Sequence, residues 1–116
     1  MKINKKKIDI ETGKWNKIEI RKGSIAPRSR HNSLKIDSKT MLISPGLFGR
    51  NKLSNSFDFF HTDDNSCEKV DSKSLFCSYR AGHCSVYDPN TKKIFMFGGF
   101  NQSSQLINDP CLISMN

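Results

Sequence analysis

Residues 80–100 read RAGHCSVYDPNTKKIFMFGGF, and this stretch decides the fold class. Two short apolar segments, 83–87 and 93–97, are separated by Asp88-Pro89-Asn90-Thr91, which has the composition of a tight turn. A glycine pair, Gly98-Gly99, follows the second segment. Apolar runs of about five residues bounded by turn-forming residues predict two antiparallel strands joined by a hairpin.

The rest of the chain continues this pattern. No stretch of ten or more residues keeps its apolar side chains at helical spacing. Sequences rich in Gly, Pro, Asn, Asp and Ser instead separate short apolar segments. We therefore predict an all-β chain of antiparallel sheets. The expected strands are 8–10, 15–20, 31–36, 40–44, 56–60, 67–70, 83–87, 93–97 and 110–113.

An internal repeat connects the two halves of the chain. His31 and His83 are 52 residues apart (83 − 31), and Arg28 and Arg80 have the same spacing. Further on, the spacing is 53, which predicts a one-residue shift beyond the glycines. A period near ~50 residues is typical of repeat architectures such as propellers. The other pairs at 52 are Ile43 with Phe95, Gly46 with Gly98 and Trp15 with Cys67, and those at 53 are Leu53 with Leu106 and Asn55 with Asn108.

The repeated residues resemble the kelch motif. Arg80-Ala81-Gly82-His83, segment 94–100 and segment 106–109 are together similar to the first three quarters of a kelch repeat. Segment 27–47 resembles a more divergent copy that keeps one glycine of the pair, and segment 9–15 resembles the closing strand of a preceding repeat. The resemblance implies four-stranded antiparallel kelch blades, about two of them, in an incomplete β-propeller.

The resemblance also divides the chain. Residues 1–22 would form a basic N-terminal segment with the outer strand of a preceding blade, 23–74 a degenerate kelch-like blade, and 75–116 a second repeat truncated before its last strand. Because propellers have about four to eight blades, two blades do not close a ring. We expect a fragment of a larger propeller, with a homo-oligomer as the alternative if the chain is complete.

Ten residues carry the motif, and we assign them structural roles. Glycines permit positive φ and close backbone approach. The tryptophan would bury its ring against the next blade, and the arginines would donate charge-assisted hydrogen bonds to loop carbonyls. The ten residues are Asp9, Trp15, Arg28, His31, Gly46, Arg80, Gly82, His83, Gly98 and Gly99.

The loops are the expected binding elements. In the kelch family, ligand contacts come mostly from loops between strands, so the resemblance implies a protein-protein interaction module or scaffold. We expect partner contacts from loops 46–54 and 100–104, with Phe48, Arg50, Phe100 and Asn101 as candidate residues. The identity of the protein partner does not follow from these residues.

We assign no catalytic residue, metal ligand or cofactor, and we expect no enzymatic activity. Neighbouring residues of a strand point to opposite faces, so His83 and Cys84 do not form a nucleophile-base pair. His31 and His83 occupy equivalent positions in different repeats, whereas metal ligands must converge.

Charge leaves two alternative functions open. Of the net charge of +8, all lies in residues 1–40, which hold 12 Lys and Arg against 4 Asp and Glu. A basic surface that binds nucleic acid or anionic lipid is the first alternative. The second is a fragment of a propeller enzyme whose catalytic groups lie in other blades.

The sequence also bears on location. It has no apolar run near the ~20 residues that span a bilayer, and no apolar segment follows the lysines at its start. We therefore expect a cytoplasmic protein, with the nucleus as an alternative. The four cysteines lack the usual zinc spacings, and we expect reduced thiols.

Overall fold

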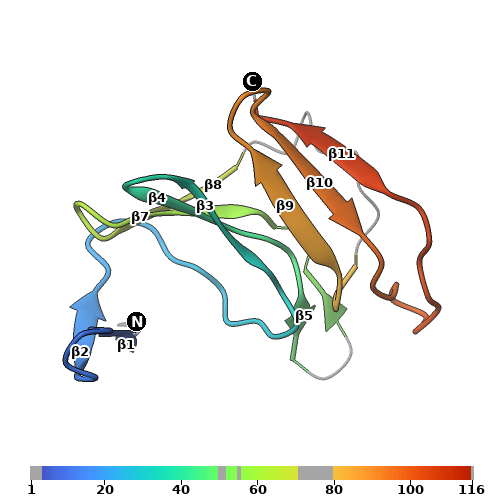
Figure 1. The fold of residues 1–116 in the computed structure, drawn as a ribbon. Helices are drawn as coiled ribbons and strands as arrows, with labels where there is room; N and C mark the ends of the chain where they lie inside the picture. Colours follow the sequence, from blue (N-terminus) through green and yellow to red (C-terminus); the bar gives the residue numbers. More distant parts are fainter. Residues whose placement is uncertain (1–3, 50–51, 55, 71–79, 116) are drawn as a thin grey trace.

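The computed structural model describes residues 4–49, 52–54, 56–70 and 80–115 (Figure 1). These residues form antiparallel β-sheets and contain no helix. In chain order the strands are β1 Asn4–Ile8, β2 Trp15–Glu19, β3 Ser33–Asp37, β4 Thr40–Ile43, β5 Leu47–Phe48, β6 Lys52–Leu53, β7 Asp58–His61, β8 Ser66–Lys69, β9 Cys84–Asp88, β10 Lys93–Phe97 and β11 Cys111–Ser114. Across this part of the chain, no helix has the length and apolar character needed to cross a bilayer.

The strands form two larger sheets and two hairpins. Strands β3-β4-β7-β8 make a four-stranded sheet, which we call unit 1. Strands β9-β10-β11 make a three-stranded sheet, unit 2, and β1 with β2 makes the N-terminal hairpin. The short pair β5-β6 connects β4 to β7 at one end of unit 1. The prediction of an all-β chain with antiparallel sheets is confirmed.

Units 1 and 2 repeat the same strand pairing. In unit 1 Leu42 lies opposite Leu34 and Phe59, and in unit 2 Phe95 lies opposite Val86 and Leu112. The offset is 52 from β3 to β9, and 53 both from β4 to β10 and from β7 to β11. The internal repeat predicted from the sequence is therefore present in the backbone pairing.

The position of the one-residue shift corrects the predicted alignment. Ile43 pairs with Asp58 as Met96 pairs with Cys111, so Ile43 is equivalent to Met96 and not to Phe95. The extra residue lies in the β9-β10 turn, because six residues separate Tyr87 from its partner Ile94 (94 − 87 − 1), whereas five separate the equivalent pair Lys35 and Met41 (41 − 35 − 1). An exposed turn accommodates an insertion more easily than a packed corner does.

The N-terminal hairpin belongs to the same pattern. Ile8 pairs with Trp15 as Phe60 pairs with Cys67, both residues being shifted by 52. The hairpin is thus equivalent to β7 and β8, the last two strands of unit 1. The sequence predicted strands at 8–10 and 15–20, and the structure places the first one earlier, with residues 9 and 10 following the strand. The resemblance assigned only one strand to a preceding repeat.

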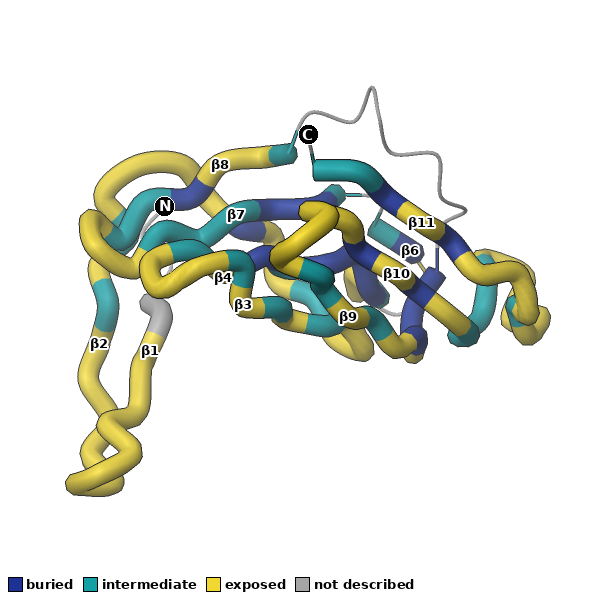
Figure 2. Tube along the Cα trace, turned by 45° about the horizontal axis from the view of Figure 1, so that its top comes forward, coloured by how far each residue is buried: buried dark blue, intermediate teal, exposed yellow. Residues whose placement is uncertain are grey.

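Units 1 and 2 bury one face each against the other (Figure 2). The buried cluster contains Leu42, Phe57, Ile94, Met96, Cys111 and Ile113, with Leu34, Phe59 and Tyr87 among the partly buried residues around it. Burial of a large aliphatic side chain contributes about 1.5–3 kcal/mol, so this cluster is the main source of cohesion between the sheets. The N-terminal hairpin is largely exposed (Figure 2).

Two expectations about side chains are not met. Trp15 is 64% exposed, so the burial of its ring expected from the motif is not observed; its equivalent, Cys67, is 5% exposed. The expectation of four reduced thiols is wrong for Cys111, which is disulfide-bonded, whereas Cys67 and Cys84 are thiols. Cys77 lies outside the described residues.

Candidate functional site

A buried arginine ties the strands of unit 1 together. Arg28 donates hydrogen bonds from Nη1 to the carbonyl oxygens of Ser44 (3.0 Å) and Ser56 (2.7 Å). Its Nη2 donates to Asp58 Oδ2 at 2.5 Å, and the side chains of this ion pair are 2% and 1% exposed. The arginine bonds to loop carbonyls expected from the sequence are therefore observed.

Arg80 plays the same part in unit 2. Its Nη1 donates to the carbonyl oxygens of Asp109 (2.9 Å) and Gly98 (3.3 Å). Burial lowers the pKa of Arg80, and the charge of Asp109 opposes this effect. The carbonyls of Ser56 and Asp109 are equivalent acceptors, whereas those of Ser44 and Gly98 lie one position apart in the repeat. The position equivalent to Asp58 is occupied by Cys111.

A glycine next to each arginine corner permits close backbone approach. A Cβ on Gly99 would lie 2.5 Å from the carbonyl oxygen of Ala81, and one on Gly46 would lie 2.4 Å from that of Ser29. Gly46 is thus the equivalent of Gly99, which corrects the predicted match to Gly98. Gly98 has φ +81° and open space around it, so it meets only the conformational requirement.

The two units meet through polar contacts as well as the apolar cluster. Asn32 donates from Nδ2 to the carbonyl oxygen of His83 at 2.6 Å, and the Arg30 carbonyl accepts from the backbone N–H of Gly82 at 2.8 Å. Ser44 Oγ lies 3.0 Å from His83 Nε2. Burial lowers the pKa of His83 to about 4, helped by the positive charges of Arg80 and His31, so this ring is neutral at physiological pH.

The junction does not form a nucleophilic site. Ser44 and His83 have the spacing of a nucleophile and a base, but they are 2% and 5% exposed and leave no room for a substrate. Cys84 is exposed on the opposite face of its strand, as predicted from the alternation of side chains. Among the described residues no cluster of three or more His, Cys, Asp or Glu side chains is arranged to hold a metal ion.

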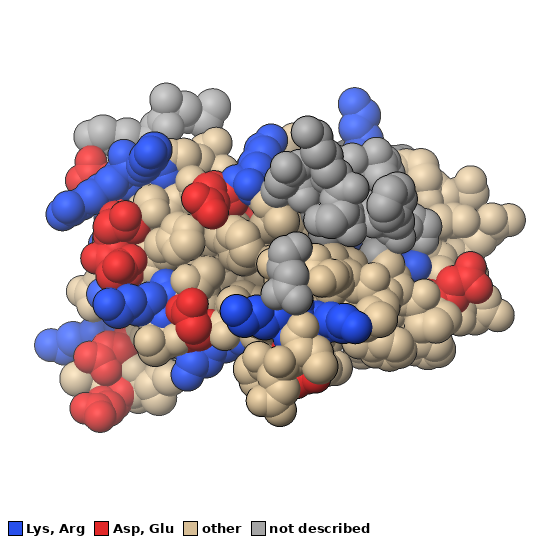
Figure 3. All heavy atoms as spheres, turned by 90° about the horizontal axis from the view of Figure 1, so that it is seen from above, with Lys and Arg blue, Asp and Glu red and all other residues tan. Residues whose placement is uncertain are grey.

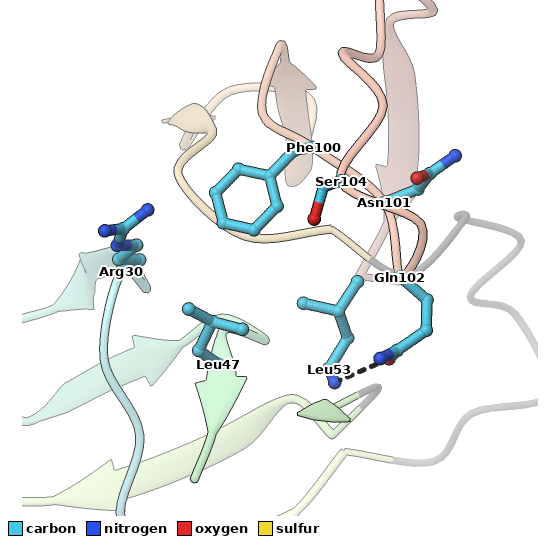
Figure 4. A pocket seen from close by; sticks show the side chains of 7 residues that line it. All are labelled: Arg30, Leu47, Leu53, Phe100, Asn101, Gln102 and Ser104. Carbon is cyan, nitrogen blue, oxygen red and sulfur yellow. Dashed lines mark hydrogen bonds between the residues drawn. The ribbon is translucent and has the colours of Figure 1, made fainter. Parts of the chain in front are cut away.

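A pocket of about 240 Å³ opens where the loops of the two units meet (Figure 4). Gln102 reaches across from unit 2 and accepts a hydrogen bond from the backbone N–H of Leu53 at 2.9 Å. The Arg30 guanidinium lies 5.5 Å from the centre of the Phe100 ring, a cation-π contact. The lining residues are Arg30, Leu47, Leu53, Phe100, Asn101, Gln102 and Ser104.

The unit 2 side of this pocket is held by its own hydrogen bonds. Asn101 Oδ1 accepts from the backbone N–H groups of Ser103 and Gln105, and Asn101 Nδ2 donates to Gln105 Oε1. Ser104 has φ +60°, which closes this tight loop. A loop fixed in this way loses little conformational entropy when it binds a partner.

The predicted contact residues are distributed over two neighbouring pockets. Phe100 and Asn101 line the junction pocket, whereas Phe48 is 45% exposed and lines a second pocket of about 390 Å³ beside Ile25. Arg50 lies outside the described residues. The sequence did not single out Arg30, whose left-handed conformation (φ 57°) is uncommon for arginine.

Comparison with known proteins does not assign the chain to a family. A scan against models of protein families and a search of curated proteins both gave no match. The assignment of a function therefore depends on the internal geometry described above.

Proposed function

We propose that this chain contributes consecutive kelch-type blades to a β-propeller and serves as a protein-protein interaction module without catalysis of its own. The observation that carries the proposal is the repetition of the site formed by the buried arginine and the close-packed glycine. The same arginine, the same close-packed glycine and the same strand pairing occur in units 1 and 2 at offsets of 52 and 53 residues. A repeated sheet that buries one face against the next sheet is typical of a propeller.

The loops at the junction support an interaction role. On the part of its rim that the structure describes, the junction pocket combines three apolar side chains with the cation of Arg30 and the neutral polar side chains of Asn101, Gln102 and Ser104. Aromatic and arginine side chains next to a preformed pocket are typical of binding hot spots. Phe48 adds an exposed aromatic ring from the β5-β6 hairpin of unit 1.

The distribution of charge favours a protein partner over a polyanion. On the face seen in Figure 3, Lys and Arg side chains are interspersed with Asp and Glu. Nucleic acid binding needs a stripe of basic residues that follows the phosphate backbone. The face in Figure 3 has no such continuous stripe among its described residues.

The test is quantitative affinity capture with the immobilised chain. The double variant Arg30→Ser, Phe48→Ser should bind at least about tenfold less of each captured protein than the wild-type chain does. A tenfold loss of affinity corresponds to about 1.4 kcal/mol, and a hot-spot residue contributes more than that. Direct binding of each captured protein is then measured by calorimetry.

The matched control is Asp63→Ser, an exposed residue in the turn between β7 and β8, remote from both pockets in sequence. The control should recover the same proteins as the wild-type chain. Equal recovery by the double variant and the control would contradict a role for these loops.

A further inference from the structure

The junction pocket carries a positive charge that no carboxylate neutralises within the described part of the chain. Arg30 is exposed, and among the described residues its guanidinium forms no ion pair. None of the described lining residues of the pocket is Asp or Glu. The planar guanidinium matches the geometry of a carboxylate and binds it through two parallel hydrogen bonds. Arg30 is therefore available for an acidic group on a ligand.

Arg30 also departs from the internal repeat. Its equivalent in unit 2, at the offset of 52 (82 − 30), is Gly82, and the two residues have φ values of 57° and 70°. Glycine adopts this left-handed conformation without strain, whereas arginine does so at a cost. Unit 1 thus keeps a strained and exposed arginine at a position where unit 2 has glycine. Strain of this kind is typical of functional sites.

A second lining residue of the same pocket shares this conformation. Four non-glycine residues of the described chain have positive φ. Asn65 and Lys92 lie in the turns of hairpins, whereas Arg30 and Ser104 both line the junction pocket. Figure 4 shows the Ser104 hydroxyl directed into the pocket, on the opposite side from Arg30. A hydroxyl in this place can donate a hydrogen bond to a bound ligand.

The other lining residues limit the size and chemistry of the ligand. Leu47, Leu53 and Phe100 supply an apolar surface between Arg30 and Ser104 (Figure 4). The volume of about 240 Å³ is below the ~300–1,000 Å³ typical of small-molecule sites, so the pocket suits one or two amino-acid side chains. Phosphorylated segments are usually held by a cluster of arginines, whereas the described lining has one cation.

We infer that the junction pocket binds a segment of a partner protein that pairs the side-chain carboxylate of an Asp or Glu with Arg30 and packs a neighbouring apolar side chain on Leu47 and Leu53. The cation-π contact with Phe100 holds the guanidinium in place before the segment binds, which lowers the entropic cost of binding. The inference rests on the proposed interaction function and names the chemistry of the partner.

Selection of peptides from a random phage-displayed library tests the inference. Peptides fused to the coat protein through their carboxyl ends offer only side-chain carboxylates. Those selected on the immobilised wild-type chain should be enriched in Asp and Glu next to an apolar residue. Each is then synthesised with an amidated carboxyl terminus, and its Kd is measured by fluorescence anisotropy.

A double-mutant cycle tests the direct contact. Arg30→Gly should raise the Kd at least about tenfold, which corresponds to about 1.4 kcal/mol. Replacement of the acidic residue of the peptide by its amide should do the same. The two changes together should raise the Kd no further than either one alone, because both remove the same contact. Fully additive losses would contradict a contact between Arg30 and the acidic residue.

Lys92→Gly is the matched control. It also removes one positive charge from an exposed residue with left-handed φ (55°), but Lys92 does not line the pocket. The control should bind the peptides as the wild-type chain does. Arg30→Gly and Lys92→Gly should have the same midpoint of urea unfolding, because glycine relieves positive φ at both positions. A lower midpoint in Arg30→Gly alone would give Arg30 a structural role and overturn the inference.

Failure of this inference is distinguishable from failure of the proposed function. Selected peptides without enrichment in acidic residues, or with equal affinity for the wild-type chain and Arg30→Gly, would overturn the acidic partner segment and leave an interaction module. A selection that yields no peptide would also overturn it. The proposed function is judged separately, by the capture of whole proteins.

Discussion

Units 1 and 2 each contain a buried arginine that bonds to backbone carbonyls, but the two units differ at one position next to this arginine. In unit 1 the buried Arg28 has the carboxylate of Asp58, and in unit 2 the equivalent position is Cys111, which is disulfide-bonded. One carbonyl acceptor is common to both units, Ser56 in unit 1 and Asp109 in unit 2, so this bond is the part of the arrangement that the repeat keeps. The acidic partner is a local addition in unit 1.

Substitution of Asp58 should have the largest effect on the stability of the chain. In Asp58→Ala the guanidinium of Arg28 stays buried without the carboxylate, and loss of one partner of a buried ion pair costs about 3–5 kcal/mol. Urea unfolding followed by circular dichroism measures the change. Asp63→Ala, at an exposed turn residue, should change stability by less than about 0.5 kcal/mol. A loss below about 1 kcal/mol in Asp58→Ala would mean that the carbonyls alone hold Arg28.

Three glycines near the buried arginines separate the effect of positive φ on stability from the effect of close backbone approach. Gly99→Ala combines a positive φ with a Cβ 2.5 Å from a backbone oxygen, whereas Gly98→Ala has only the positive φ. Left-handed strain alone costs about 1–2 kcal/mol, so Gly98→Ala should lose that amount and Gly99→Ala clearly more. Gly46→Ala isolates the close approach without positive φ. Thermal melts of the three variants should rank Gly99→Ala as least stable, and equal melting temperatures would contradict the close approach.

The histidine at the junction predicts a pH dependence. Because the pKa of His83 is about 4 in the folded chain and has its ordinary value of 6.5 in the unfolded chain, the folded chain binds fewer protons between these pH values. Stability should therefore fall as pH decreases from about 6.5 to 4, by up to about 1.4 kcal/mol per pH unit. Hydrogen bonds in exposed turns lower the pKa of Asp37, Asp64 and Asp88 from 3.8, so these groups act below that window.

Two variants identify the group responsible. His83→Gln should flatten the dependence between pH 6.5 and 4. His31→Gln, at the equivalent exposed position in unit 1, should retain a dependence because His83 is still present. Urea unfolding at several pH values distinguishes the two, and an unchanged slope in His83→Gln would assign the effect to another group.

The smallest effect is expected at Trp15. Its ring is 64% exposed, so Trp15→Ser should change the stability of the isolated chain by less than about 0.5 kcal/mol. Cys67, the equivalent residue in unit 1, is 5% exposed, and Cys67→Ser buries a hydroxyl in its place. Chemical denaturation should separate the two variants clearly. A large loss in Trp15→Ser would mean that the hairpin packs against the body in solution.

The strands were predictable because their signals are local. Alternating apolar residues and turn-forming aspartates placed the longer strands within a few residues, since Asp37 and Asp88 each accept backbone N–H bonds in their turns. The two-residue strands β5 and β6 were missed because so short a pair has no periodicity.

The junction was less predictable because it depends on contacts between distant residues. Ser44 and His83 are 39 residues apart, and nothing in their immediate neighbours indicates that they touch. The position of the one-residue shift also depends on strand register, which the spacing of motif residues alone left ambiguous. The two loops of the junction pocket were predicted individually, but their convergence was visible only in the folded chain.

The longer turn of unit 2 has a practical consequence. The turn that contains Pro89 to Thr91 is one residue longer than its equivalent in unit 1, and the contacts of Arg80 and Gly99 are retained in unit 2. Exposed turns that tolerate natural length variation are suitable sites for inserted peptides. An epitope tag or a fluorophore-binding sequence placed in this turn would report on the chain in a cell while leaving the junction pocket unobstructed.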